Sequence, residues 1–223
     1  MTRIKVCGLQ PEDDLNFVED ERVSHIGVIF VPESKRYVAP DCAAQLVNRV
    51  RGRARVMGVF SDASLNRVRS DLRQSGAHGA QLHGDETPDM CHRLRNEGYE
   101  VWKALRVFNE ETAEELLDRI SNYNGVVDGV LLDAAPPKGV PSGVTGGHGN
   151  AFNWGILSKL LLLAKNQSLA PVWVAGGLNA DNVKKLLEYF MPFGVDVSSG
   201  VETNGRKDPQ RISAFIEAVK QPV

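Results

Sequence analysis

The sequence predicts an α/β protein: a single-domain (β/α)8 TIM barrel with parallel strands that spans residues 1–223. Short apolar runs rich in β-branched residues alternate with stretches of helical spacing from end to end. This alternation gives eight strand–helix pairs, about 28 residues each, close to the usual repeat of this barrel. The strands are almost continuously apolar, which is typical of a parallel sheet covered on both faces.

The expected strands are, in order, residues 4–6, 25–31, 56–60, 80–83, 101–105, 126–133, 172–175 and 195–198. Each is followed by apolar positions at helical spacing, around residues 15–18, 43–50, 65–72, 90–94, 113–120, 157–161, 183–187 and 212–219. The alternative is a doubly wound open sheet. Because the repeats show no obvious reversal of order, the closed barrel is favoured.

Residues that typically begin or end helices stand at the expected boundaries of several of these helices. Asp208 and Pro209 combine an N-cap residue with a proline at the first helical position, and Asn179 is expected to cap the seventh helix. Gly76 and Gly98 stand where two helices should stop. The stretch "AAPPKGVPSGVTGGHGN" (134–150) is too rich in glycine and proline for a helix and predicts a long, functional loop after the sixth strand.

Composition excludes several classes of protein. The net charge is -2 and the pI about 6.2, so nothing indicates binding to nucleic acid or to an anionic membrane. The N-terminus enters a strand pattern directly, without the apolar stretch of a signal peptide, and no segment is apolar enough to span a bilayer. Three cysteines without CxxC spacing indicate neither disulfides nor zinc, which predicts a cytoplasmic location.

In this barrel, reactive side chains belong at the carboxyl ends of the strands. Cys7, Arg36, His83 and Asp133 all fall at or just beyond such ends. Each also has a structural explanation: Cys7 as a core filler, Asp133 as a cap or loop anchor, His83 as a hydrogen-bonded rim histidine and Arg36 as a solvated charge. Asp133 closes the apolar run "GVLLD", and a purely structural role explains it least well, because burying an unpaired carboxylate is costly.

Glycines gather in the last loops, where this barrel often cradles a phosphate on backbone N–H groups. The residues expected to form this site are Gly146, Gly147, His148, Gly176, Gly177, Ser199 and Gly200. The spacing fits neither a Walker loop nor a GxGxxG fingerprint. A metal site at His83, Asp85 and Asp133 is the competing interpretation, but no HExxH or paired-histidine spacing supports it.

The segments "KVCGL", "SKRYV", "QLHGDE", "VLLD", "GGHG", "VAGGLNADNV" and "GVDVSSGVE" followed by "GRKD" resemble, in order, the motifs of phosphoribosylanthranilate isomerase of tryptophan biosynthesis. The resemblance covers nearly the whole chain. It implies an Amadori rearrangement of N-(5-phospho-β-D-ribosyl)anthranilate to 1-(2-carboxyphenylamino)-1-deoxy-D-ribulose 5-phosphate, with no cofactor and no metal. A phosphorylated small molecule is the expected partner, and the chain is expected to be a monomer or a homodimer.

The resemblance also implies roles for residues. Asp133 is the general acid that opens the sugar ring, and Cys7 is the general base that takes the C2 proton. To act near neutral pH, Cys7 should have a pKa below that of a free thiol. Arg36 matches the arginine that binds the anthranilate carboxylate, while His83 and Asp196 match positions near the substrate.

The chain departs from the family pattern at Gly146–His148, where family members usually have threonine in place of the histidine. This predicts phosphate binding with altered pH dependence. Two alternatives remain: a broader sugar-phosphate isomerase that also accepts the histidine-pathway aminoimidazole substrate, and a non-catalytic phospholigand-binding barrel. The first would use two aspartates where this chain has Cys7 and Asp133; the second would not need to keep Cys7, Arg36 and Asp133 together.

Overall fold

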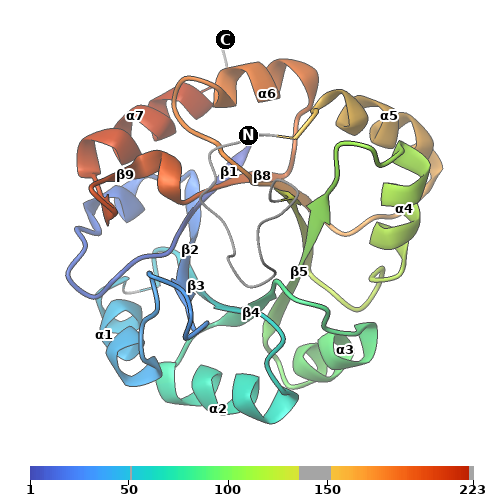
Figure 1. Cartoon of the computed structure of the whole chain (residues 1–223). Coiled ribbons are helices and arrows are strands. Elements are labelled where there is room, and N and C mark those ends of the chain that lie inside the picture. The colour runs from blue at the N-terminus through green and yellow to red at the C-terminus, as the bar shows by residue number, and fades with distance from the viewer. Residues whose placement is uncertain (51, 136–151, 221–223) are drawn as a thin grey trace.

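A computed structural model describes residues 1–50, 52–135 and 152–220. Its eight parallel strands close into a barrel in sequence order (Figure 1): β1 (Arg3–Cys7), β2 (Val23–Ile29), β3 (Arg55–Phe60), β4 (Gly79–Leu82), β5 (Glu100–Val107), β6 (Gly129–Ala134), β7 (Val172–Val174) and β8 (Gly194–Val197). β1 pairs in parallel with both β2 and β8. The predicted barrel is therefore confirmed, and the open sheet is excluded because its two end strands are joined.

Helices surround the barrel (Figure 1): α1 (Pro40–Val50), α2 (Leu65–Ser75), α3 (Pro88–Asn96), α4 (Ala113–Ser121), α5 (Gly155–Leu163), α6 (Val183–Tyr189) and α7 (Pro209–Val219). Short 3-10 turns lie at η1 (Asn16–Glu19), η2 (Ala164–Asn166) and η3 (Ser199–Val201). After η3, the two-residue strands β9 (Glu202–Thr203) and β10 (Arg206–Lys207) pair antiparallel. None of the helices in these ranges combines the length and the apolar character that a membrane crossing needs.

The first repeat differs from the prediction, because the helix expected around residues 15–18 is only the 3-10 turn η1. Two aspartates explain the difference. The backbone N–H of Gln10 donates to the Asp13 carboxylate at 2.8 Å, and that of Asn16 donates to Asp14 at 2.8 Å. Such local side-chain bonds compete with the helical ladder and hold the chain in turns.

The predicted helix ends are largely correct. Asp208 caps α7 by accepting from the N–H groups of Gln210 and Arg211, and Gly76 ends α2 in the left-handed conformation. Asn179 does not cap α6 directly. Its side chain accepts from the N–H groups of Asp181 and Asn182, one turn before the helix begins.

Three apolar clusters stabilise the described part of the fold. The largest lies between the outer face of the barrel and the helices, a second fills the barrel interior, and a small third one consists of Cys7, Ile29, Val31 and Val59. In the interior the rings of Trp102 and Trp173 pack with centroids 4.3 Å apart, and His25 lies 4.7 Å from Trp102. These rings fill part of the barrel interior.

Candidate active site

A pocket of about 70 Å³ opens at the mouth of the barrel. Most of the side chains predicted for the site line it together: Cys7, Arg36, His83, Asp133, Gly176, Gly177, Asp196 and Ser199. They come from six strands or the loops that follow them, since parallel strands in a closed barrel all present their carboxyl ends to the same opening. The structure thus brings together residues that are far apart in the sequence.

Cys7 ends β1 and is buried, with 7% of its surface exposed. Burial raises the pKa of its thiol, and the ammonium of Lys5 opposes this without reversing it. The expected depression of this pKa is therefore wrong for the ligand-free protein. That expectation came from what a base near neutral pH requires, and it did not include desolvation, which is the largest effect here.

Asp196 lies at the floor of the pocket with 8% of its surface exposed. Both of its carboxylate oxygens accept from Lys5 Nζ at 3.1 Å. Burial raises the pKa of Asp196, although the Lys5 ammonium pulls in the other direction. A substrate can reach this carboxylate only from the pocket side.

Asp133 ends β6 and forms a pair with His83, whose Nε2 lies 3.1 Å from Asp133 Oδ2. The other ring nitrogen of His83 lies 3.2 Å from the Gln81 side-chain nitrogen. The Oε1 atom of Gln81 is buried and has no hydrogen-bond partner among the described residues. Because a buried acceptor without a partner is costly, this oxygen is suited to receive a hydroxyl or N–H group from a ligand.

Arg36 is almost fully buried, and a carboxylate already occupies one edge of its guanidinium group. Its Nε and Nη2 donate to the two oxygens of Glu202 at 2.6 and 2.8 Å. Lys207 donates to the same carboxylate at 2.7 Å. Burial alone would raise the pKa of Glu202, but Arg36 and Lys207 together lower it to about 2. A ligand carboxylate would have to use the other edge of Arg36.

The glycines after β7 adopt backbone conformations that suit an anion cradle. Gly176 and Gly177 have φ of 86° and 64°. A Cβ on Gly176 would lie 2.5 Å from the backbone nitrogen of Ala134, so this position has no room for a side chain. Gly200 does not line the pocket but fits tightly beneath it, since a Cβ there would lie 1.9 Å from the Leu178 carbonyl oxygen. Gly146, Gly147 and His148 lie outside the described residues.

The site contains residues that sequence reasoning missed: Lys5, Gln81, Glu202 and Lys207. Lys5 and Gln81 precede Cys7 and His83 by two positions, so strand alternation places each on the same inward face as its neighbour. A polar residue inside an apolar strand was the available signal. Glu202 had no such signal, because its partner Arg36 lies 166 residues away.

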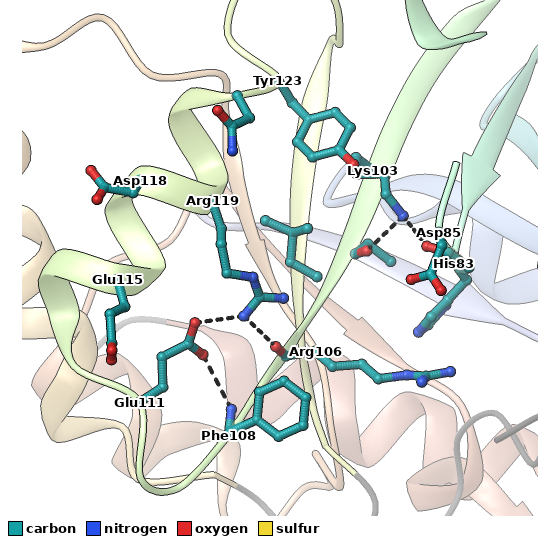
Figure 2. Close-up of a pocket in the computed structure, with 14 residues that line it drawn as sticks. His83, Asp85, Lys103, Arg106, Phe108, Glu111, Glu115, Asp118, Arg119 and Tyr123 are labelled. Carbon is teal, nitrogen blue, oxygen red and sulfur yellow. Dashed lines mark hydrogen bonds and ion pairs between the residues drawn. The ribbon is translucent and has the colours of Figure 1, made fainter. Parts of the chain in front are cut away.

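A larger cavity of about 830 Å³ lies beside the mouth, between the end of β5 and α4 (Figure 2). His83 lines both spaces. Several of the charged groups in the larger cavity are tied to one another: Arg119 donates to Glu111 at 2.5 Å, and the Lys103 ammonium contacts Glu86 at 3.2 Å. Within the described ranges, no group of three or more His, Cys, Asp or Glu side chains is arranged to hold a metal ion.

The fold and the site define a class: a (β/α)8-barrel enzyme whose acidic, basic and thiol side chains meet at the carboxyl ends of the strands. The sequence model of the family described as N-(5'phosphoribosyl)anthranilate (PRA) isomerase matches residues 4–218. The chain therefore belongs to the N-(5'-phosphoribosyl)anthranilate isomerase family, isomerases of tryptophan biosynthesis.

Individual relatives agree along the full length. The Clostridium acetobutylicum N-(5'-phosphoribosyl)anthranilate isomerase is 36% identical, with 99% of each chain covered. The crystal structure of the Thermotoga maritima enzyme superimposes with a TM-score of 0.80 at 30% identity, covering 98% of both chains. A further crystal structure of phosphoribosyl anthranilate isomerase holds reduced 1-(o-carboxyphenylamino)-1-deoxyribulose 5-phosphate, with a TM-score of 0.77, 28% identity and 98% of both chains covered.

Proposed function

We propose that this chain converts N-(5-phospho-β-D-ribosyl)anthranilate into 1-(2-carboxyphenylamino)-1-deoxy-D-ribulose 5-phosphate by general acid–base catalysis. The observation that carries the proposal is that Cys7 and Asp133 line one pocket together with the backbone of Gly176 and Gly177. Membership of the isomerase family supports the same reaction. A related enzyme that binds a reduced form of the product supports the same chemistry.

Asp133 is proposed as the acid. It gives a proton to the ring oxygen of the ribose, the bond from that oxygen to C1 breaks, and the nitrogen lone pair forms a Schiff base. His83, 3.1 Å from the carboxylate, holds the acid in its orientation. Gln81 helps to orient His83, because its side-chain nitrogen lies 3.2 Å from the second ring nitrogen of His83.

Cys7 is proposed as the base. Once the imine is cationic, the C2 proton is acidic; the sulfur takes it, and the electron pair moves to give an enolamine. This intermediate tautomerises to the ketone. Because burial raises the pKa of Cys7, the thiolate is the minor form in the ligand-free protein near neutral pH. The reaction should therefore accelerate with rising pH until the thiol is titrated.

Binding is proposed to divide across the pocket. Backbone N–H groups beside Gly176, Gly177 and Ser199 receive the phosphate, since their conformations expose amides without a side chain in the way. The free edge of Arg36 receives the anthranilate carboxylate as a charge-assisted pair. Gly146, Gly147 and His148 are proposed to add to the phosphate site from the sixth loop.

The test is the decay of the substrate's anthranilate fluorescence with purified protein. Cys7→Ala and Asp133→Asn should each lower kcat by at least about a hundredfold, the usual contribution of one acid or base. Cys42→Ala is the matched control, because this partly exposed cysteine on α1 lies outside the pocket and should keep full activity. Turnover of Cys7→Ala close to that of the wild type would remove the assigned base.

A further inference from the structure

Lys5 is a charged residue in the middle of the barrel, and its whole surface is buried. It lies on β1, two positions before Cys7, so both side chains point to the same side of the strand. Its ammonium is 3.1 Å from each carboxylate oxygen of Asp196. A buried ion pair rarely stabilises a fold more than apolar side chains of similar size would. Stabilisation of the fold therefore does not by itself explain why a charged lysine lies at this position.

The Lys5 ammonium lies against the Cys7 sulfur. Gly27 on β2 is the register partner of Cys7, and a Cβ at this glycine would lie 2.6 Å from Cys7 Sγ and 3.1 Å from Lys5 Nζ. The absence of a side chain at Gly27 therefore leaves room beside it for both atoms. An ammonium next to sulfur favours the thiolate over the thiol, as cations do in reactive cysteine sites.

Other charged groups face Cys7 from the neighbouring elements. Lys207 on β10 adds a smaller positive influence than Lys5, and Arg36 from the loop after β2 interacts with the sulfur more weakly still. Asp196 on β8 opposes both as an anion. His83 and Asp133, across the mouth, act on Asp196. Among the cations, Lys5 has the strongest effect on the sulfur.

We propose that Lys5 is a positioning residue for Cys7: its buried ammonium stabilises the thiolate over the thiol, and the neighbouring Asp196 carboxylate works against it at the sulfur. The thiol proton leaves to solvent while the sulfur keeps the electron pair, which is then available to take a proton from carbon. The use of the thiolate in catalysis rests on the proposed isomerase function. The charge arrangement around Cys7 is independent of that function.

The experiment measures the thiolate of Cys7 directly. In a Cys42→Ser/Cys91→Ala background Cys7 is the remaining cysteine. Its alkylation by iodoacetamide is followed by mass spectrometry from about pH 7 to pH 11.5, on protein shown by tryptophan fluorescence to be folded at each pH. The midpoint of the rate–pH curve reports the pKa of the thiol.

Two variants should shift this midpoint in opposite directions. Lys5→Met should raise it by about one unit or more, with alkylation at pH 8 slowed roughly three- to tenfold after allowing for the higher nucleophilicity of a more basic thiolate. Asp196→Asn should lower the midpoint, because the ammonium then interacts with the sulfur without a competing carboxylate. Lys103→Met is the control: this lysine is equally buried and pairs with Glu86 outside the mouth pocket, so the midpoint should not move.

A purely structural role of the pair gives a different pattern. Loosening the pocket floor would expose Cys7 and speed alkylation in both Lys5→Met and Asp196→Asn. Midpoints that shift in the same direction in the two variants, or an unchanged midpoint in Lys5→Met, would refute the inference. If Lys5→Met does not fold, the double variant Lys5→Met/Asp196→Asn replaces it, and its midpoint must lie above that of Asp196→Asn alone.

The inference and the proposed function can fail separately. If the variants show the expected alkylation shifts but the wild-type protein causes no decay of substrate fluorescence, the isomerase proposal is refuted and the Lys5–Cys7 relation is left intact. Normal turnover by the wild-type protein, together with no alkylation shift in the variants, would refute the role of Lys5 and leave the isomerase proposal standing.

Discussion

Replacing Glu202 by glutamine should destabilise the protein in a pH-dependent way. The Glu202 carboxylate accepts from Arg36 at 2.6 and 2.8 Å and from Lys207 at 2.7 Å, and 7% of its side chain is exposed. These partners lower its pKa from 4.5 to about 2. Glutamine keeps the shape but accepts weakly and carries no charge, so it leaves Arg36 and Lys207 without their counter-ion.

The size of the effect follows from linkage. A shift of this size corresponds to about 3 kcal/mol at 1.36 kcal/mol per unit, and to about 2 kcal/mol after allowing for solvent screening at the mouth. Because the folded-state pKa is depressed, this stabilisation is fully present above the unfolded pKa of 4.5 and is lost as the pH falls toward 2. The difference between wild type and Glu202→Gln should therefore shrink by roughly half or more between pH 7 and pH 3.

The assay is urea unfolding at pH 7, 5, 4 and 3, followed by the fluorescence of the buried Trp102 and Trp173. Glu217→Gln is the matched control, because Glu217 pairs with Lys220 at 2.6 Å on the exposed side of α7. It should show no comparable pH dependence. A difference between wild type and Glu202→Gln that stays constant from pH 7 to pH 3 would contradict the charge-pair explanation.

Three further predictions concern the site and the opposite end of the barrel. Arg36→Ala should raise KM by tenfold or more and change kcat little if the free edge of the guanidinium binds the substrate carboxylate; an unchanged KM would exclude that role. Gly176→Ala should raise KM and lower the melting temperature more than Gly98→Ala does, since both glycines have positive φ but a Cβ at Gly98 meets no atom within 4 Å. Glu100→Gln should destabilise at pH 7 by about 1–3 kcal/mol and much less at pH 3, because His25 and Arg55 lower the Glu100 pKa to about 2 against the effect of burial; equal loss at both pH values in urea titrations would count against it.

The sequence alone determined the architecture and the end of the barrel where the candidate site lies. Apolar strands of period two and helices of period 3.6 are local properties, and eight repeats of this kind close into a barrel whose strand ends meet. The strand order therefore places Cys7, Arg36, His83 and Asp133 at one end of the barrel, whereas Asp196 was indicated by the family resemblance; all five line the pocket at the mouth. The helix predicted in the first repeat was wrong, because the Asp13 and Asp14 carboxylates accept hydrogen bonds from nearby backbone N–H groups and hold this segment in turns.

Only the tertiary structure decided what each of these groups experiences. The occupation of one edge of Arg36 by Glu202 joins residues 166 positions apart, and no periodic pattern reports such a pair. The raised pKa of Cys7 arises because burial outweighs the Lys5 charge. Desolvation and long-range pairing depend on how the whole chain packs, whereas strands, helices and their order depend on neighbours in the sequence. The influence proposed for the Lys5 ammonium on the Cys7 sulfur is likewise a property of the packed barrel, and an alkylation midpoint that does not respond to that ammonium would disprove it.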